Sequence, residues 1–371
     1  MTALFTPLTL RGTTFANRAW TSPMCMYACE DRTGRVTAWH RAHYAQFALG
    51  GAGLVVTEAT AVLPEGRVTP QDAGLWNDSQ TAAWATVTEA VHAVGGKIAV
   101  QLAHAGRKGG KYRGLPGDAH RNRSVPVEEG GWSTLGASDE PFGDYAPPRP
   151  ATGDELDQVV QAFAVSARRA VEAGFDAVEL HGAHGYLLHE LLSPVTNRRD
   201  DDWGGGGRER LLVAAAAAVR VAIGDEVPLL VRVSAEDVAP GGLDAYDTAR
   251  LARRLREVGV DLVDCSSGGL VAGADYFEEP GYQVPGAAVV RTEGGVPTAA
   301  VGRITDAWQA EQVLRDGSAD AVMIGRAMLR DPHWARHAAA ELDAPGAPVE
   351  PRYYRAWRGT VLDGLTVPTP V

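Results

Sequence analysis

The chain has 371 residues, 45% of them hydrophobic, which is enough for one large α/β barrel or for two domains of ordinary size with a sizeable core. Its formal net charge of −11 argues against nucleic acid or an anionic membrane as a partner, because both attract a basic surface. The three cysteines show no pairing pattern, the N-terminus shows no signal-peptide pattern, and no apolar run is long enough to span a bilayer. These features predict a cytoplasmic protein.

Short apolar runs bounded by turn residues recur along the chain and predict buried strands. The predicted strands are Ala19–Pro23, Gly53–Glu58, Lys97–Leu102, Phe175–Leu180, Pro228–Val233, Val260–Ser266, Val296–Val301 and Ala319–Ile324. Most of these runs are followed by an amphipathic, alanine-rich stretch that predicts a helix. The predicted helices are Trp39–Leu49, Ser79–Val94, Thr152–Ala173, Arg208–Ile223, Ala245–Glu257 and Asp306–Arg315.

Glycines follow the predicted helices and strengthen this interpretation, because glycine tolerates the backbone conformation that ends a helix. They are Gly50 with Gly51, Gly95 with Gly96, Gly174, Gly224, Gly259 and Gly317. Eight strands that alternate with helices predict a (β/α)₈ TIM barrel formed by one domain, residues 1–371. A doubly wound parallel sheet is the alternative, but eight units in one long chain favour a closed barrel.

Two segments depart from the alternation of strand and helix. Residues 103–150, after the third strand, are rich in glycine, proline and charge, and they are too long for a plain loop. We expect them to form a cap over the barrel mouth. Residues 345–371 form a C-terminal tail with the aromatic and basic sequence P-R-Y-Y-R-A-W at Pro351–Trp357. This tail could lie against its own barrel or at an interface with a neighbouring subunit, and it suggests a homodimer or homotetramer.

The sequence E-L-H-G-A-H-G-Y at Glu179–Tyr186 follows the fourth predicted strand, at the end where barrels of this kind place their active sites. Residues three apart in a turn lie on the same side, so His181 and His184 can face one place, with the phenol of Tyr186 nearby. Two neutral donors beside a phenol suit a substrate whose oxygen gains negative charge while a neighbouring carbon needs a proton. A loop whose histidines only satisfy backbone groups is the alternative.

Residues at the other strand ends indicate a bound anion. Gly302 and Gly325, after strands seven and eight, allow a close approach of the backbone to a phosphate, and Arg303 and Arg326 add positive charge. Tight turns without a ligand are the alternative for these glycines. Arg232 ends the fifth strand, where a lone buried charge is costly, so an anionic partner such as a flavin ring is expected in the barrel mouth.

Other strand-end groups allow different kinds of site. Gln101 offers both a donor and an acceptor, as the edge of a flavin ring requires. His181 and His184 could bind zinc as a pair, but a catalytic zinc site usually has a third protein ligand, for which His104 is conceivable. Cys25 and Cys29 have no second pair of cysteines, which makes a structural zinc site a weak hypothesis, and Cys25 alone could be a nucleophile. We therefore predict no metal.

Four motifs in order resemble the old yellow enzyme family of FMN-dependent ene-reductases, in the branch of the xenobiotic reductases and the thermophilic-like members. They are S-P-M-C-M-Y at Ser22–Tyr27, G-G-A-G-L-V-V-T-E-A-T at Gly50–Thr60, Q-L-A-H-A-G-R-K at Gln101–Lys108 and E-L-H-G-A-H-G-Y-L at Glu179–Leu187. The similarity extends over nearly the whole chain. It implies a TIM barrel, FMN as cofactor, and NAD(P)H as co-substrate with NADPH favoured.

The resemblance also implies roles for single residues. Flavin contacts would come from Pro23, Met24, Cys25, Ala59, Gln101 and Arg232, with Gly302, Gly325 and Arg326 near the phosphate. His181 and His184 would hold a carbonyl or nitro oxygen, and Tyr186 would donate the proton. Tyr27 would line the substrate pocket, and Arg355 or Trp357 would reach into a neighbouring subunit's site.

The function that the resemblance implies is the reduction of activated C=C bonds, in unsaturated carbonyls, imides and nitroalkenes, at the expense of NAD(P)H. Related iron–sulfur dehydrogenases need a four-cysteine set that this chain lacks. A zinc hydrolase and a non-catalytic flavin-binding protein are the remaining alternatives. Two departures from the family pattern leave local details open: the glycine-rich Trp203–Arg210 stretch before a helix, and Val301 where a tryptophan can stand.

Overall fold

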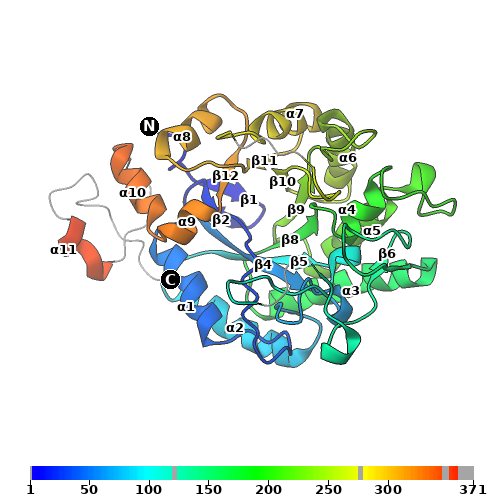
Figure 1. The fold of residues 1–371 in the computed structure, drawn as a ribbon. Helices are drawn as coiled ribbons and strands as arrows, with labels where there is room; N and C mark the ends of the chain where they lie inside the picture. The colour runs from blue at the N-terminus through cyan, green and yellow to red at the C-terminus, as the bar shows by residue number, and fades with distance from the viewer. Residues whose placement is uncertain (1, 119–122, 275–278, 345–350, 358–371) are drawn as a thin grey trace.

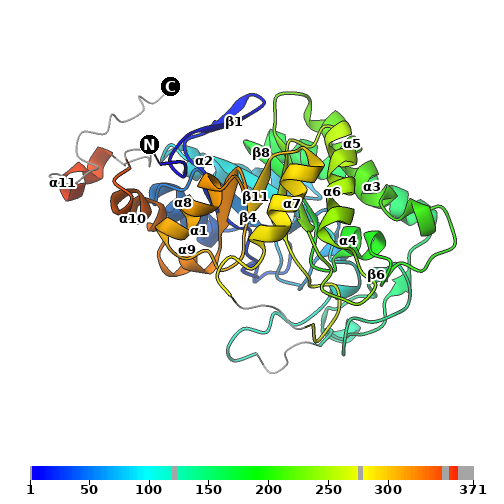
Figure 2. The ribbon, with the colours of Figure 1, turned by 90° about the horizontal axis from the view of Figure 1, so that it is seen from above.

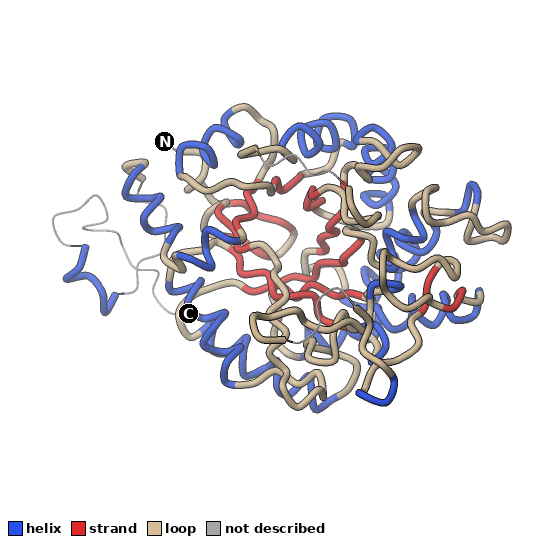
Figure 3. Tube along the Cα trace, viewed as in Figure 1, coloured by secondary structure: helices blue, strands red, loops and turns tan. Residues whose placement is uncertain are grey.

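A computed structural model describes residues 2–118, 123–274, 279–344 and 351–357 of the chain. Eight parallel strands close into a barrel in the order β10-β11-β12-β3-β4-β5-β8-β9, and helices surround it (Figures 1 and 3). The barrel strands are β3 (Ala19–Thr21), β4 (Leu54–Ala61), β5 (Ile98–Ala103), β8 (Ala177–Gly182), β9 (Leu229–Ser234), β10 (Leu262–Ser266), β11 (Thr298–Ala300) and β12 (Ala321–Ile324). The predicted TIM barrel is therefore confirmed, and the doubly wound sheet is excluded.

All six predicted helices form, and each ends near a predicted glycine. The longer helices are α1 (Ala38–Leu49), α2 (Asp78–His92), α3 (Gly153–Glu172), α5 (Arg210–Ile223), α6 (Ala245–Glu257), α7 (Val284–Gly294), α8 (Ala307–Arg315) and α10 (Trp334–Glu341). Short helices are α4 (Leu187–Leu192), α9 (Arg326–Arg330) and α11 (Tyr354–Trp357). Gly174 at φ 88° and Gly317 at φ 68° adopt the left-handed conformation that stops a helix. The sequence did not predict α7, whose first turn contains Pro285 and Gly286.

An N-terminal hairpin, which the sequence did not predict, closes one end of the barrel. Its strands β1 (Leu8–Leu10) and β2 (Thr13–Phe15) pair antiparallel. Leu10 and Phe15 pack into the same apolar cluster as Trp20 and Leu54, which stand at the starts of β3 and β4. The hairpin therefore plugs the end where the strands begin, opposite the loops that follow them (Figure 2).

Side chains inside the barrel form an apolar layer and then a polar layer. Ala99, Ala177, Leu230 and Leu262 belong to the apolar cluster at the hairpin end. Because alternate residues of a strand face the same side, the residues two positions further along these strands also point inward. They are Gln101, Glu179, Arg232 and Asp264, all at most 5% exposed. The polar layer thus lies between the plugged end and the mouth.

The segment 103–150 lies at the mouth, against the loops that follow several strands (Figure 2). Lys108 Nζ donates to the carbonyl oxygens of His184 (2.8 Å) and Gly269 (2.9 Å), and the Ala137 amide donates to Glu190 of α4 (2.7 Å). Among the described residues of this segment, regular structure is limited to single turns and the short strands β6 (Leu135–Gly136) and β7 (Arg149–Pro150). Among the helices that the structure describes, none has the length and apolar character needed to cross a membrane.

Candidate active site

The polar layer below the mouth contains two carboxyl groups and one guanidinium. Gln101 Nε2 donates to Glu179 Oε1 (2.7 Å), and Arg232 Nε lies 3.3 Å from Asp264 Oδ2. Arg232 also donates from Nη1 to Ser22 Oγ (3.1 Å). Arg232 is therefore not the lone charge that the sequence suggested, because the strand pairing β9–β10 sets Asp264 beside it.

Burial makes this layer hold a proton. Burial, and then the nearby Asp264, raises the pKa of Glu179, while burial also raises the pKa of Asp264 against the opposing effect of Arg232. Two carboxyls facing one guanidinium cannot both be charged at low cost in a buried layer. We conclude that the pair retains one proton between its members near neutral pH, which leaves the layer close to electrically neutral.

The predicted histidines and tyrosine come together at the end of β8. The ring of His181 lies 5.1 Å from that of His184 and 4.8 Å from that of Tyr186, in both cases nearly perpendicular. The backbone between them is a tight turn, with His184 at φ 58° and Gly185 at φ 71°. A Cβ on Gly185 would stand 2.5 Å from the Gly269 carbonyl oxygen, so only glycine fits there.

Both imidazoles are neutral and the phenol is protonated. Burial lowers the pKa of His181 and His184 well below the usual range, helped by the positive charges of Arg232 and Lys108. Burial, and then Cys25, raises the pKa of Tyr186 well above its usual value. The turn therefore presents two neutral N–H donors and one O–H donor over the whole physiological pH range.

A hydrogen-bond chain connects His184 to a large cavity beside the β8 turn. His184 Nε2 lies 2.7 Å from Ser266 Oγ, and the Ser266 hydroxyl donates to Gln283 Oε1 (3.0 Å). Because the hydroxyl proton is used on Gln283, Ser266 accepts from His184, which places the ring proton on Nε2. A substrate oxygen that binds at Nε2 must therefore displace Ser266.

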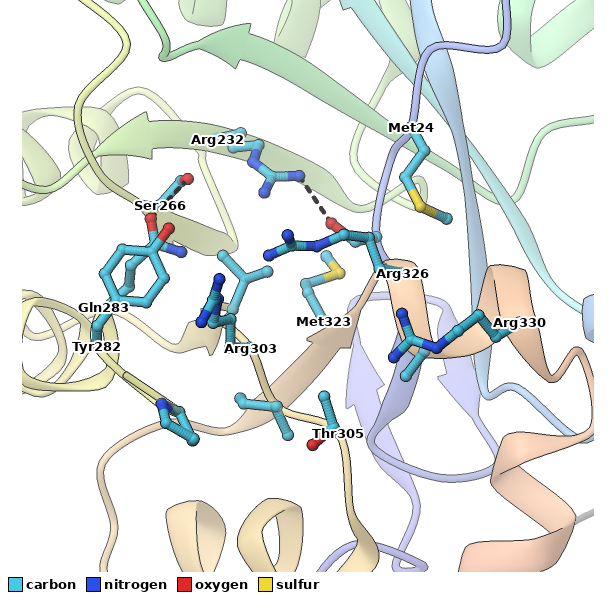
Figure 4. A pocket seen from close by; sticks show the side chains of 17 residues that line it. Met24, Arg232, Ser266, Tyr282, Gln283, Arg303, Thr305, Met323, Arg326 and Arg330 are labelled. Carbon is cyan, nitrogen blue, oxygen red and sulfur yellow. Dashed lines mark hydrogen bonds between the residues drawn. The ribbon is translucent and has the colours of Figure 1, made fainter. Parts of the chain in front are cut away.

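The cavity has a volume of about 540 Å³ and lies at the ends of β3 and β9 to β12 (Figure 4). It is lined by Ser22, Met24, Arg232, Ser266, Pro280, Tyr282, Gln283, Val301, Gly302, Arg303, Ile304, Thr305, Met323, Gly325, Arg326, Ala327 and Arg330. Arg303, Arg326 and Arg330 direct their guanidinium groups toward it (Figure 4). Within the described part of the chain, no ion pair neutralises Arg326 or Arg330, so this end of the cavity attracts an anion.

The loop after β3 passes beside the β8 turn. Burial, and then the charges of Asp72 and Glu58, raises the pKa of the Cys25 thiol, so Cys25 is a thiol and not an activated nucleophile. Burial raises the pKa of Tyr27 as well, and the next largest influences are Cys25 and Tyr186, which are its neighbours. Tyr27 has φ 55°, a conformation rare for a bulky residue and frequent at functional sites.

A β-bulge in β4 directs Glu58 to this loop. The register between β4 and β5 shifts between Val56 and Ala59. Glu58, inside the bulge, accepts from the Met26 amide (3.1 Å) and from Tyr44 Oη (2.9 Å). A bulge changes the direction in which a side chain points, and bulges are frequent next to active sites. Here the bulge directs the Glu58 carboxylate to the amide of Met26, the residue after Cys25.

The predicted site residues do not all lie in one place. Met24, Arg232, Gly302, Gly325 and Arg326 line the cavity. The structure puts His181, His184, Tyr186, Tyr27 and Cys25 at the adjoining β8 turn, while Gln101 and Ala59 pair with each other across β4 and β5, and Pro23 precedes Met24. Arg355 is exposed on α11, which stands away from the barrel mouth of its own chain (Figures 1 and 2), and the side chain of Trp357 is outside the described residues.

Several lining residues were missed from the sequence. Arg330 lies four residues after Arg326 in α9, and this spacing on one helix face was a usable signal. Gln283 and Tyr282 precede α7 in a stretch without any motif, so only the fold brings them to the cavity. Among the described residues, no group of three or more histidine, cysteine, aspartate or glutamate side chains is arranged to hold a metal ion.

Comparison with known proteins gives a consistent result. Residues 3–344 match the model of the NADH:flavin oxidoreductase / NADH oxidase family. An NADPH dehydrogenase of Geobacillus thermodenitrificans is 44% identical over 360 residues, which cover 96% of this chain and 99% of that protein. The old yellow enzyme homologue from Zymomonas mobilis superposes with a TM-score of 0.76 at 27% identity, over 95% of this chain and 98% of that one. Morphinone reductase in complex with tetrahydroNAD superposes with a TM-score of 0.74 at 27% identity, over 90% of each chain.

Proposed function

The chain belongs to the NADH:flavin oxidoreductase / NADH oxidase family, and from this premise we propose that it reduces activated C=C bonds. It is an oxidoreductase of the old yellow enzyme type, with FMN as cofactor and a reduced nicotinamide as co-substrate. The proposed substrates are α,β-unsaturated carbonyls, imides and nitroalkenes. The observation that supports this reaction most directly is the convergence of two neutral imidazoles and one protonated phenol at the end of β8.

The residues present fit FMN. The cavity is of the size usual for cofactor sites, and its end lined by Arg303, Arg326 and Arg330 suits a phosphate. At the other end, the guanidinium of Arg232 lines the cavity and can donate to a ring with acceptor atoms. Met24 and Met323 supply apolar contacts for a flat ring. When bound, FMN supplies a carrier of two electrons between the nicotinamide and the alkene.

In the proposed mechanism, His181 and His184 bind the carbonyl or nitro oxygen of the substrate, which replaces Ser266 Oγ as the acceptor for His184 Nε2. Their neutral N–H groups stabilise the negative charge that develops on this oxygen, and loss of one such donor typically costs about 10²–10³ in rate. Tyr186 holds the proton for the α-carbon, since its raised pKa keeps the phenol protonated. Tyr27, which lies near Tyr186, completes the proposed substrate pocket.

We further propose roles for the two unusual segments. Residues 103–150 act as a cap of the single domain 1–371, supported by the hydrogen bonds of Lys108 to the β8 turn. Residues 345–371 act at a homo-oligomer interface, where Arg355 reaches a neighbouring site, supported by its exposure on α11. The three free cysteines agree with a cytoplasmic location.

The decisive experiment is anaerobic reduction of the purified protein by NADPH and by NADH, followed by cyclohexenone, a maleimide and a nitroalkene. We expect a yellow protein that NADPH bleaches and that each activated alkene restores, whereas cyclohexene does not. A protein that stays colourless with added FMN would refute the whole proposal. A protein that is yellow but never consumes NADPH would be a flavin-binding protein without this activity.

A further inference from the structure

The turn that holds His184 and Tyr186 is built from two consecutive left-handed residues, and side chains from elsewhere hold its backbone. His184 and Gly185 both have positive φ, a conformation that costs a non-glycine residue roughly 1–2 kcal/mol. The His184 amide donates to Ser234 Oγ (3.0 Å), and its carbonyl oxygen accepts from Lys108 Nζ (2.8 Å). Such a conformation persists only where the surroundings enforce it.

The remaining amide of the turn donates to a histidine that the reaction does not use. The Gly185 N–H donates to Nδ1 of His189, at 2.9 Å, and Nε2 of His189 lies 2.7 Å from Asp237 Oδ1. Both side chains are fully buried. Because an amide N–H can only donate, Nδ1 must be unprotonated, so Nε2 carries the hydrogen and donates it to Asp237.

Asp237 connects this histidine to the next βα loop. It follows β9, the strand of Arg232, and its Oδ2 accepts from Ser193 Oγ (2.6 Å) and from the Leu243 amide (2.8 Å). Burial would raise the pKa of Asp237, but the hydrogen bonds of His189 and Ser193 hold it below the usual range. An ionised Asp237 can only accept hydrogen bonds, so it keeps His189 in the tautomer that carries its proton on Nε2.

We propose that His189 and Asp237 are positioning residues: through the His189 tautomer they fix the Gly185 amide, and with it the donor atoms of His184 and Tyr186. This proposal deepens the proposed function and rests on it, because the positioned groups are those that bind and protonate the substrate. A displacement of about 1 Å at such groups can cost 10²-fold in rate.

Asp237→Asn is the sharpest test, because it preserves shape and changes only the hydrogen-bond pattern. If the amide group faces His189, it donates to Nε2 and drives the ring proton to Nδ1, which then faces the Gly185 N–H. If the amide is turned the other way, its NH₂ faces the Leu243 N–H. In either orientation two buried N–H groups face each other without an acceptor between them, which destabilises the native arrangement.

A histidine series separates positioning from packing. In His189→Asn the amide oxygen can take the place of Nδ1 and accept from Gly185, whereas His189→Leu fills the space without any acceptor. Asp176→Asn is the matched control, since Asp176 also accepts from a histidine, His92 Nε2 at 2.8 Å, but lies before β8 at the opposite end of the barrel.

Three measurements are compared on FMN-loaded protein: flavin reduction by NADPH, flavin reoxidation by cyclohexenone, and hydrogen exchange of the Gly185 amide. For Asp237→Asn and His189→Leu we expect reoxidation roughly 10- to 100-fold slower, reduction little changed, and faster exchange at Gly185. His189→Asn should recover most of the reoxidation rate, and Asp176→Asn should behave as the parent protein.

The proposal is overturned if Asp237→Asn and His189→Leu are yellow, folded and as fast as the parent in reoxidation. It is also overturned if both half-reactions slow equally, or if His189→Asn is no better than His189→Leu. Failure of the proposed function would look different, because the parent protein itself would then not be reoxidised by any alkene. The exchange of the Gly185 amide would still decide whether the pair holds the turn.

Discussion

At the scale of single residues, burial decides the protonation states of the site. The same loss of water that keeps His181 neutral keeps Tyr186 protonated, and it forces Glu179 and Asp264 to retain a proton. A site of neutral donors can stabilise a developing negative charge without placing a permanent cation against the substrate. The permanent positive charge is instead provided by Arg232 and the arginines of the cavity.

Tyr186→Phe should separate the two half-reactions. We expect reoxidation of the bound flavin by cyclohexenone to slow by roughly 10²–10⁴, because the α-carbon loses its proton donor, while reduction by NADPH changes little. Stopped-flow absorbance of each half-reaction measures this difference. Tyr246→Phe, at a phenol that is 58% exposed, is the control. Equal slowing of both half-reactions would contradict the role of Tyr186.

Glu58→Gln should remove a loss of stability that the parent protein shows as pH rises. Burial raises the pKa of Glu58 to about 7, above its usual 4.5, so the folded state binds a proton that the unfolded state releases. Stability from this group is complete below pH 4.5 and is lost as pH rises toward 7. The variant has no such loss, so its free energy of unfolding relative to the parent protein should rise by roughly 3 kcal/mol between pH 4.5 and pH 8.

Denaturant unfolding between pH 4.5 and 8 measures this rise. The exposed Glu172→Gln serves as the control, since a carboxylate in water should give a difference that is independent of pH. A free energy of unfolding of Glu58→Gln that falls relative to the parent protein with rising pH would contradict the assignment of a retained proton.

At the scale of elements, the residues that stabilise the barrel and those that form the candidate active site lie at opposite ends of it. The β1–β2 hairpin plugs the end where the strands begin, with Phe15 fully buried against Trp20 at a ring distance of 4.9 Å. The ends of β3 and β8 to β12, with the loops that follow them, supply the side chains of the site at the other end. Changes at one end should therefore leave the other end intact, as is general for TIM barrels.

Phe15→Ala tests this separation. We expect a loss of roughly 3–5 kcal/mol in the free energy of unfolding, because a large buried ring is removed from a packed cluster. The KM values for NADPH and cyclohexenone should stay unchanged at a temperature where the variant is folded. Val221→Ala, at a side chain that is 85% exposed, should change neither quantity. A raised KM in folded Phe15→Ala would show that the two ends are coupled.

At the scale of the whole molecule, the short helix α11 lies beyond the closed barrel, beside α10, where Arg336 lies 5.9 Å from the Tyr353 ring. The match to the family model ends at residue 344, and α11 lies at the edge of the molecule in both ribbon views. Arg355 on this helix is exposed and far from the mouth of its own barrel. The proposed role of Arg355 therefore requires that another molecule brings a site to it.

Removal of residues 345–371 should therefore leave a folded, yellow protein with a smaller assembly and a higher KM for the alkene. Light scattering and steady-state kinetics measure the two effects. Arg355→Ala should reproduce a rise in KM of roughly tenfold without a change in mass, while the exposed Arg352→Ala should not. A truncated protein with unchanged mass and KM would contradict a role of the tail in a neighbouring site.

The sequence by itself determined the barrel, because strands and helices are encoded by local periodicity and helix ends by single glycines. It also determined which strand ends hold polar residues, since each such group directly follows its strand. It could not determine the partners of these residues. The two members of each pair are far apart in the chain: 32 positions for Arg232 and Asp264, 82 for His184 and Ser266, and 48 for His189 and Asp237.

Only the closed barrel decided these pairs. Parallel pairing sets the register between neighbouring strands, and closure then brings the loops after β8, β9 and β10 to one rim. A hydrogen bond requires its atoms to lie within about 3 Å, a condition that depends on register and strand tilt and leaves no pattern in a single chain. The sequence thus identifies the polar side chains at the strand ends, and the tertiary structure determines which of them contact each other.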